Sequence, residues 1–109
     1  MSTSNLGDVR NKAVEITLGE RTYNLLYDLN AFADIEESHG SITDLLNQME
    51  KGSAKAIRAM IWAGLQTNEN PPTEKEVGAL ISMGDMESIA QAIQKALIKS
   101  MPEGKNEKN

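Results

Sequence analysis

The sequence predicts an α+β fold that is mostly α, with an N-terminal β-hairpin followed by four to five short packed helices. Apolar and polar residues alternate between positions 13 and 27, which is the period of a half-buried strand. From position 28 onward, apolar residues recur every three to four positions, and glycine, proline and capping residues separate the stretches. The 109 residues suit one domain. We therefore expect a flexible arm over 1–12, a single globular domain over 13–101 and a disordered tail over 102–109.

The hairpin is predicted from the register that its loop would impose. Gly19-Glu20 suits a two-residue loop with glycine in the first position. Such a loop pairs Ile16 with Tyr23 and Val14 with Leu25, and these four apolar residues then share one face. Because two strands alone are marginally stable in water, we expect this face to pack on helices.

The first two predicted helices each begin at a side-chain cap and end at a glycine. Asp28 caps a helix that ends at Gly40, and Ser41 caps a shorter helix that ends at Gly52. The residues that share a stripe on the first helix are Leu29, Phe32, Ala33 and Glu36. Glu36 borders the apolar part of this stripe, so we expect it to cap a backbone amide or to meet a base such as Arg58.

The third predicted helix follows Ser53 and has the clearest period. Its apolar stripe comprises Ile57, Met60, Ile61, Gly64 and Leu65. Trp62 falls off this stripe, so its indole either packs in the fold or contacts a partner, and packing is the favoured interpretation. Thr73 and Glu76 predict a capping box for a fourth helix that Gly84-Asp85 ends, and a last helix spans about 86–100.

Composition argues against several classes of function. The net charge of −5 and the pI of about 4.8 disfavour nucleic-acid binding, which needs a concentrated basic surface. The chain has no cysteine and one histidine, so we expect no metal site. No apolar run reaches the ~20 residues of a membrane span and the N-terminus lacks the pattern of a signal peptide, so we expect no membrane partner and a cytoplasmic location.

Motifs for catalysis and for phosphate binding are absent, so we expect neither an enzyme nor a cofactor. His39, the single candidate base for a triad, lies at a predicted helix end, where a histidine serves the helix dipole. Asp34 and Glu37 fall opposite the apolar stripe of the first helix and are expected to face solvent.

Six methionines are a mild excess in a chain of this length. Met60, Met83, Met86 and Met101 each lie on or beside an apolar stripe, and core packing is the favoured interpretation. The alternative is a pliable surface that accepts a partner helix.

Three segments resemble the small tail assembly chaperones of long-tailed bacteriophages and of related gene transfer agents. Residues 26–37, followed by Gly40, are similar to the first helix of that family. Residues 61–65, Ile-Trp-Ala-Gly-Leu, are similar to its central helix, and residues 72–78 to its capped fourth helix. The resemblance spans about 13–100, and the order and spacing of the segments make it more specific than any one of them. Phe32 departs from the smaller aliphatic residues that are common there.

The resemblance implies a binding role in the host bacterial cytoplasm. Proteins of that family coat the tape measure protein and keep it soluble until tail tube subunits displace them, so the tape measure protein is the expected partner. Contact with the tail tube protein and self-association are further expectations. The residues expected to form the fold or the partner-binding groove are Phe32, Ile35, Ile61, Trp62 and Leu65. The alternative is another small phage morphogenesis subunit, such as a head–tail connector or a tail completion protein, which would remain in the virion.

Overall fold

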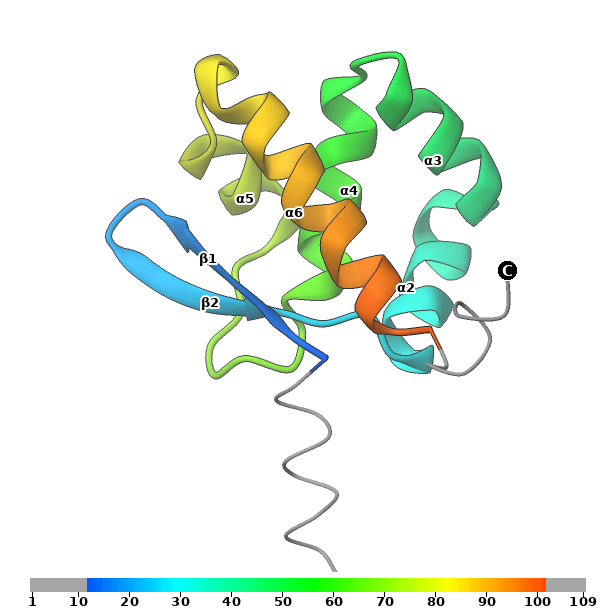
Figure 1. Ribbon diagram of the computed structural model, residues 1–109, viewed down its shortest axis with the longest axis horizontal. Coiled ribbons are helices and arrows are strands. Elements are labelled where there is room, and N and C mark those ends of the chain that lie inside the picture. The colour runs from blue at the N-terminus through cyan, green and yellow to red at the C-terminus, as the bar shows by residue number, and fades with distance from the viewer. Residues whose placement is uncertain (1–11, 102–109) are drawn as a thin grey trace, which may run out of the picture.

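A computed structural model describes residues 12–101 of the chain (Figure 1). The predicted tail and all but the last residue of the predicted arm therefore lie outside the described residues. The elements, in chain order, are β1 (Val14–Leu18), β2 (Arg21–Leu25), α2 (Leu29–His39), α3 (Ile42–Glu50), α4 (Ala54–Gly64), α5 (Glu74–Leu80), the 3₁₀ turn η1 (Met83–Asp85) and α6 (Met86–Lys99). An antiparallel hairpin followed by five α-helices confirms the predicted α+β, mostly α, fold class.

The hairpin has the predicted register. Val14 pairs with Leu25 and Ile16 pairs with Tyr23, and Gly19 in the loop has a φ of +63°, which glycine adopts without strain. The alternation stops earlier than predicted, because β2 ends at Leu25 and the next two residues are both buried.

The outer edge of β2 is covered at Asn24 by the loop that follows α4. The side-chain amide of Asn68 accepts a hydrogen bond from the Asn24 backbone N–H (2.9 Å) and donates one to the Asn24 carbonyl (2.8 Å). The backbone N–H and carbonyl of Asn24 therefore point away from β1, so Glu15 and Asn24 form a pair with no hydrogen bonds between them. In such a pair the backbone groups of the other member, Glu15, also point outward, at the free edge of β1. Within residues 12–101, no backbone hydrogen bond covers that outer edge of β1.

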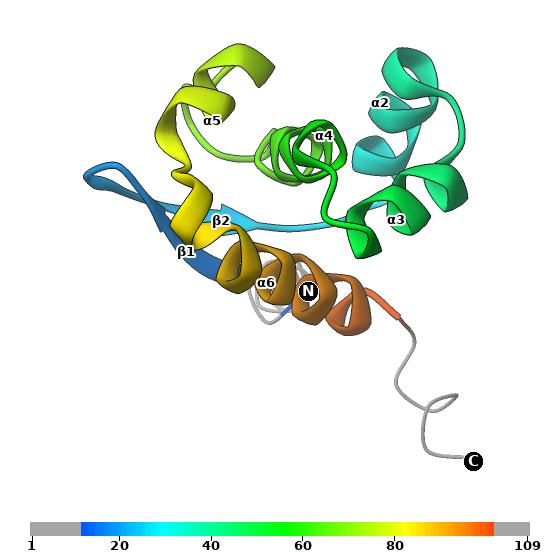
Figure 2. The same cartoon turned by 90° about the horizontal axis from the view of Figure 1, so that it is seen from above.

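Helix α4 is the centre of the domain. Helices α2 and α3 lie on one side of it and α5 on the other, while α6 and the hairpin cover a third side (Figure 2). It is buried on most of its circumference rather than along a single stripe, and its buried residues are Ala56, Ile57, Ala59, Met60, Ile61, Ala63 and Gly64. Four alanine and glycine positions in this set let the surrounding elements approach its backbone closely.

The closest of these approaches is at Gly64, the last residue of α4. A Cβ at this position would lie 2.5 Å from Leu25 Cδ1 and 3.0 Å from Tyr27 Cζ. The Tyr27 hydroxyl donates a hydrogen bond to the Met60 carbonyl (2.7 Å), and the backbone N–H of Leu26 donates one to the Gly64 carbonyl (2.8 Å). The segment that leaves β2 is thus fastened to the last turns of α4.

The predicted caps are present. Asp28, Ser41, Ser53 and Thr73 each accept a hydrogen bond from the backbone N–H three residues on, and Thr73 and Glu76 form the complete capping box. The predicted stripe of α2 is wrong in its phase, because Leu29 is 81% exposed and Ala31 and Ile35 are the buried residues. The reason is the preceding connection: Tyr27 is buried directly before the cap, which fixes the rotation of α2 and turns Leu29 outward.

None of the helices in the described part of the chain is long and apolar enough to cross a membrane.

Candidate partner-binding groove

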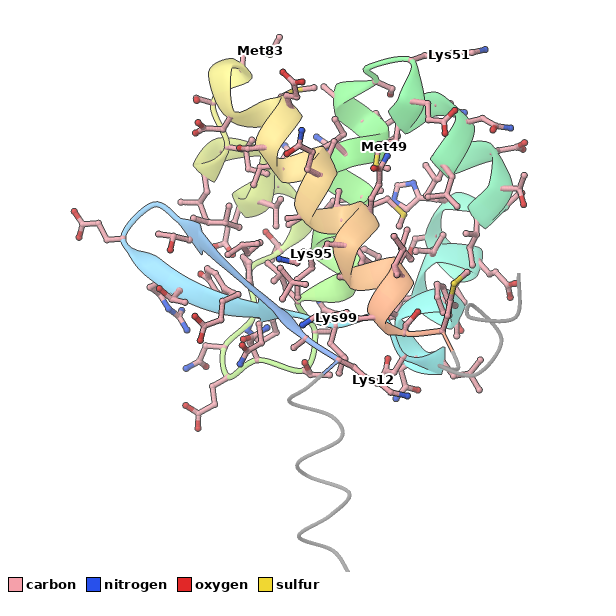
Figure 3. All side chains as sticks on the ribbon, in the orientation of Figure 1. Lys12, Met49, Lys51, Met83, Lys95 and Lys99 are labelled. Atoms are coloured by element: carbon pink, nitrogen blue, oxygen red, sulfur yellow. The ribbon has the colours of Figure 1, made fainter. Side chains whose placement is uncertain are left out.

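An apolar cavity of about 340 Å³ lies where α4, α5, η1 and α6 meet. The residues that line it are Ala54, Lys55, Ile57, Arg58, Gly78, Ile81, Met83 and Met86. Ile57 belongs to the core, and Ile81 and Met86 are partly buried against it. Met83 is 79% exposed at the tip of the turn (Figure 3). We call this feature the α4–α6 groove.

Local structure explains why the groove is open. Gly78 has no side chain on the face of α5 that meets α4, and a Cβ there would lie 3.1 Å from Arg58 Cδ. The stem of Arg58 therefore lies across Gly78 at one wall. The opposite wall is held by the η1 turn, in which the Ser82 hydroxyl donates to the Asp85 carboxylate (3.0 Å) and places Met83 at the rim.

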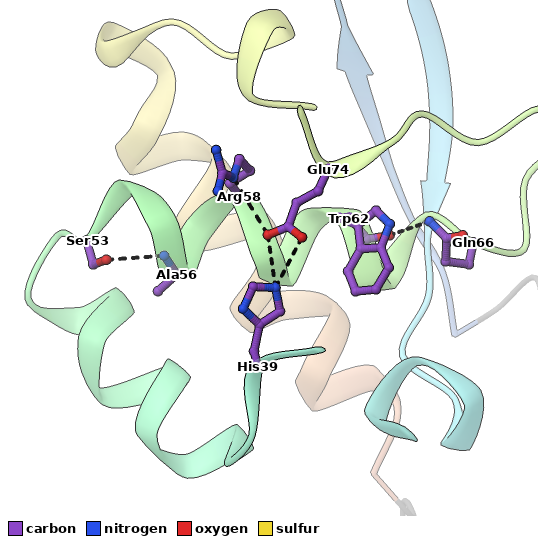
Figure 4. A network of polar contacts seen from close by, with 7 residues as sticks. All are labelled: His39, Ser53, Ala56, Arg58, Trp62, Gln66 and Glu74. Atoms are coloured by element: carbon purple, nitrogen blue, oxygen red, sulfur yellow. Dashed lines mark hydrogen bonds and ion pairs between the residues drawn. The ribbon is translucent and has the colours of Figure 1, made fainter. Parts of the chain in front are cut away.

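Both charged residues that line the groove are basic, and one of them belongs to a polar network behind it (Figure 4). Arg58 Nε lies 3.6 Å from Glu74 Oε2. His39 Nε2 lies 3.0 Å from Glu74 Oε2 and 3.1 Å from Oε1. Glu74 is in the first turn of α5 and His39 in the last turn of α2, so this carboxylate connects three helices.

The network corrects one expectation and adds to another. Glu36 is exposed, and the carboxylate that meets Arg58 belongs to Glu74 instead. Glu36 does not reach Arg58 because the rotation of α2 turns its side chain to solvent. His39 is in the last turn of α2 as predicted, and it also packs edge-on against Trp62 with a ring separation of 6.3 Å.

The five residues predicted for fold or groove divide into two groups. Ile35, Ile61 and Leu65 are fully buried and contribute to the core of the isolated domain. Phe32 and Trp62 are partly exposed, and neither lines the α4–α6 groove. Trp62 packs against the core beside His39, and Phe32 stacks on Tyr27 with ring centroids 6.2 Å apart.

Phe32 lines a second cavity of about 620 Å³ between the start of α2 and the end of α6. Leu29, Leu26 and Tyr27 supply most of its other apolar surface. Lys12 and Ser100, which lie at or beside the two ends of the described range, also line it. The α4–α6 groove is the smaller of the two and is lined by none of the residues near the ends of the described range.

Met83 and Met86 are the methionines of the groove that the sequence pointed to, and the methionines occupy different environments in the structure. Met60 is fully buried in the core and Met86 is partly buried, while Met83 and Met101 are mostly exposed. Core packing is therefore confirmed for Met60, whereas the exposed Met83 and Met101 leave the alternative of a partner-binding surface as a prediction. The spacing of Met83 and Met86 beside Ile81 was the available signal, but the contribution of α4 to the same cavity depends on tertiary packing.

Apolar walls and two cations suit an amphipathic peptide segment. Within residues 12–101, no group of three or more histidine, aspartate or glutamate side chains is placed to hold a metal ion.

A family model described as "Phage tail tube protein, GTA-gp10" matches residues 11–101, which include the whole of the described range, 12–101. No curated protein and no solved structure matches the chain.

Proposed function

The chain belongs to the phage tail tube protein family described as GTA-gp10, and from this premise we propose that it is a tail assembly chaperone that binds the tape measure protein. In this role it acts in the cytoplasm of the host bacterium and keeps the tape measure protein soluble until tail tube subunits take its place. It binds and releases a polypeptide and transforms no substrate.

The observation that carries this proposal is the α4–α6 groove. An apolar helix aggregates in water unless its apolar face is covered, and a groove with apolar walls can cover it. Met83 at the rim is 79% exposed and Met86 lies beside the core, so two flexible, polarizable side chains can adjust to different apolar residues. Pliable contacts of this kind suit a complex that must later be released.

Co-expression tests the proposal. A tape measure fragment with a long amphipathic helical segment should be recovered in the soluble fraction only when this protein is present. Met83→Asp should abolish that effect without unfolding the domain, because the side chain is mostly exposed. Leu29→Asp is the matched control, since Leu29 is 81% exposed at the other apolar surface.

The control also locates the site. If Leu29→Asp removes the solubilising effect and Met83→Asp does not, the partner binds at the Phe32 cavity rather than at the α4–α6 groove. If the fragment stays insoluble with the unaltered protein, and a longer fragment behaves in the same way, the chaperone proposal is wrong.

A second candidate function is a permanent subunit of the tail, and the family description as a tail tube protein favours it. The two candidates differ in what the finished particle contains. Mass spectrometry of purified particles should find no copies of a chaperone and many copies of a structural subunit.

A further inference from the structure

The α4–α6 groove differs in charge from the rest of the chain. The chain carries 16 acidic and 11 basic residues, yet the charged residues that line the groove are Lys55 and Arg58. Because local charge decides which charged partner is favoured, this contrast favours an acidic partner. We infer that the groove selects an acidic amphipathic helix, which inserts an apolar anchor between α4, α5 and α6 and brings a carboxylate to Lys55 and Arg58. This inference rests on the proposed function and specifies the chemistry of the segment that is bound.

The two cations are arranged to act together. Lys55 and Arg58 are three positions apart in α4, so their side chains are neighbours on one face of the helix. Lys55 is exposed, and Arg58 is partly exposed above Gly78. Together they form one basic rim beside the apolar walls.

Glu74 forms an ion pair with Arg58 and leaves free the part of the guanidinium that a partner would meet. Glu74 does not line the groove, and it approaches Arg58 at Nε. Among the hydrogen bonds of the described residues, none involves the Arg58 guanidinium, because even its Nε lies 3.6 Å from Glu74 Oε2 and the two terminal nitrogens have no partner. These nitrogens can donate two parallel hydrogen bonds to a carboxylate, which is the preferred geometry of an arginine–carboxylate pair.

The shape of the groove limits what can bind. A cavity of about 340 Å³ accepts one or two side chains, so a helix would lie across it rather than inside it. Ile57, Ile81 and Met86 would contact the anchor, and the rim would contact a residue about one turn away on the bound helix. The inferred ligand is therefore a helix with a bulky apolar residue and an acidic residue at a spacing of three or four.

The experiment uses three fluorescent peptides that share one apolar stripe and carry glutamate, glutamine or lysine at the flanking positions. Fluorescence anisotropy with the full chain should give a dissociation constant at least tenfold lower for the glutamate peptide than for the lysine peptide. The preference should weaken as salt is added, because both partners are exposed to solvent. Methyl NMR signals of Met83 and Met86 should shift on binding, whereas those of Leu29 should not.

Charge reversal supplies matched variants. Lys55→Glu should weaken binding of the glutamate peptide by roughly tenfold, as expected for loss of a charge-assisted contact and gain of a repulsive one. Lys95→Glu changes the same charge at an exposed position on α6 outside the groove (Figure 3) and should leave the affinity within about twofold. Arg58→Gln, which keeps the stem over Gly78, should abolish the preference for glutamate over glutamine.

The inference is overturned by equal affinity for the glutamate and lysine peptides, by the absence of binding to any of the three, or by shifts confined to the Phe32 cavity or to an interface between two copies of this chain. None of these results decides the proposed function, which depends on solubility in the co-expression test. Conversely, a clear preference for the glutamate peptide, together with an insoluble tape measure fragment, would leave the groove assigned and the chaperone role refuted.

Discussion

Gly64→Ala is expected to destabilise the domain, although alanine favours helices more than glycine does. A methyl group at this position would lie 2.5 Å from Leu25 Cδ1 and 3.0 Å from Tyr27 Cζ. Neither neighbour can move away freely, since Leu25 and Tyr27 are buried and the Tyr27 hydroxyl is bound to the Met60 carbonyl at 2.7 Å.

The magnitude follows from two opposing effects. Overpacking a close-packed core costs typically ~1–3 kcal/mol. Replacing glycine by alanine inside a helix stabilises the folded state by ~0.5–1 kcal/mol, and by less at the last residue of the helix. The net loss is then about 1–2 kcal/mol, which lowers the melting temperature of a domain this size by roughly 4–16 °C. Urea denaturation followed by circular dichroism would measure the loss directly.

Gly78→Ala is the control for this argument. It is the same substitution inside a helix, but its methyl group would meet Arg58 Cδ at 3.1 Å, and that side chain is partly exposed and can shift. We expect Gly78→Ala to be neutral or to stabilise by up to ~1 kcal/mol. A Leu25→Val background should reduce the cost of Gly64→Ala, because it removes the atom at 2.5 Å. If both glycine substitutions change stability equally, or if the background makes no difference, the close contact is not the cause.

The remaining predictions concern the polar contacts. Tyr27→Phe should cost about 1–2 kcal/mol in urea denaturation, because it removes the buried bond to Met60. Burial raises the pKa of Tyr27 above its ordinary value of 10.0, so the contribution of Tyr27 to stability should be constant below about pH 10. Above that pH the contribution should fall, because the unfolded chain releases this proton more readily. The fall in stability should be smaller in Tyr27→Phe, and an equal fall in both proteins would contradict the assignment. Thr73→Ala should lower stability by about 1 kcal/mol through loss of the capping box, as measured by thermal unfolding. His39→Ala should speed hydrogen exchange in the first turn of α5, because the contact with Glu74 joins α2 to it; unchanged exchange there would show that the contact does not hold the helices together.

Local rules explain how much of the fold could be predicted. The hairpin register follows from the spacing of Gly19 and of four apolar residues, and the helix boundaries follow from single capping residues. These signals act over a few positions, so they can be read from a single sequence. The rotation of α2 about its axis cannot be read in this way, because it depends on how the buried Tyr27 enters the core from β2.

The candidate site was harder to predict from the sequence, because it also depends on tertiary packing. Lys55 and Ile57 come from α4, Ile81 from the end of α5 and Met83 from η1, so the groove exists only once these elements pack. Of the residues expected to bind a partner, Ile35 and Ile61 were selected for an apolar period, which marks the core and the surface groove alike. The partner of Arg58 could not be foreseen either, since Glu74 is distant in sequence and reaches it only through the turn at 68–73.

The side-chain amide of Asn68 makes the two hydrogen bonds at Asn24 that a third strand would make along the outer edge of β2. Because Asn24 is occupied and Thr22 alone of the β2 residues is left with outward backbone groups, a further strand can pair along the whole hairpin only at the outer edge of β1. If two copies paired through their β1 edges, each would leave only the β2 edge occupied by Asn68 facing solvent, and a third copy could not add in the same way. Strand pairing between many copies should therefore produce closed pairs and no continuous sheet.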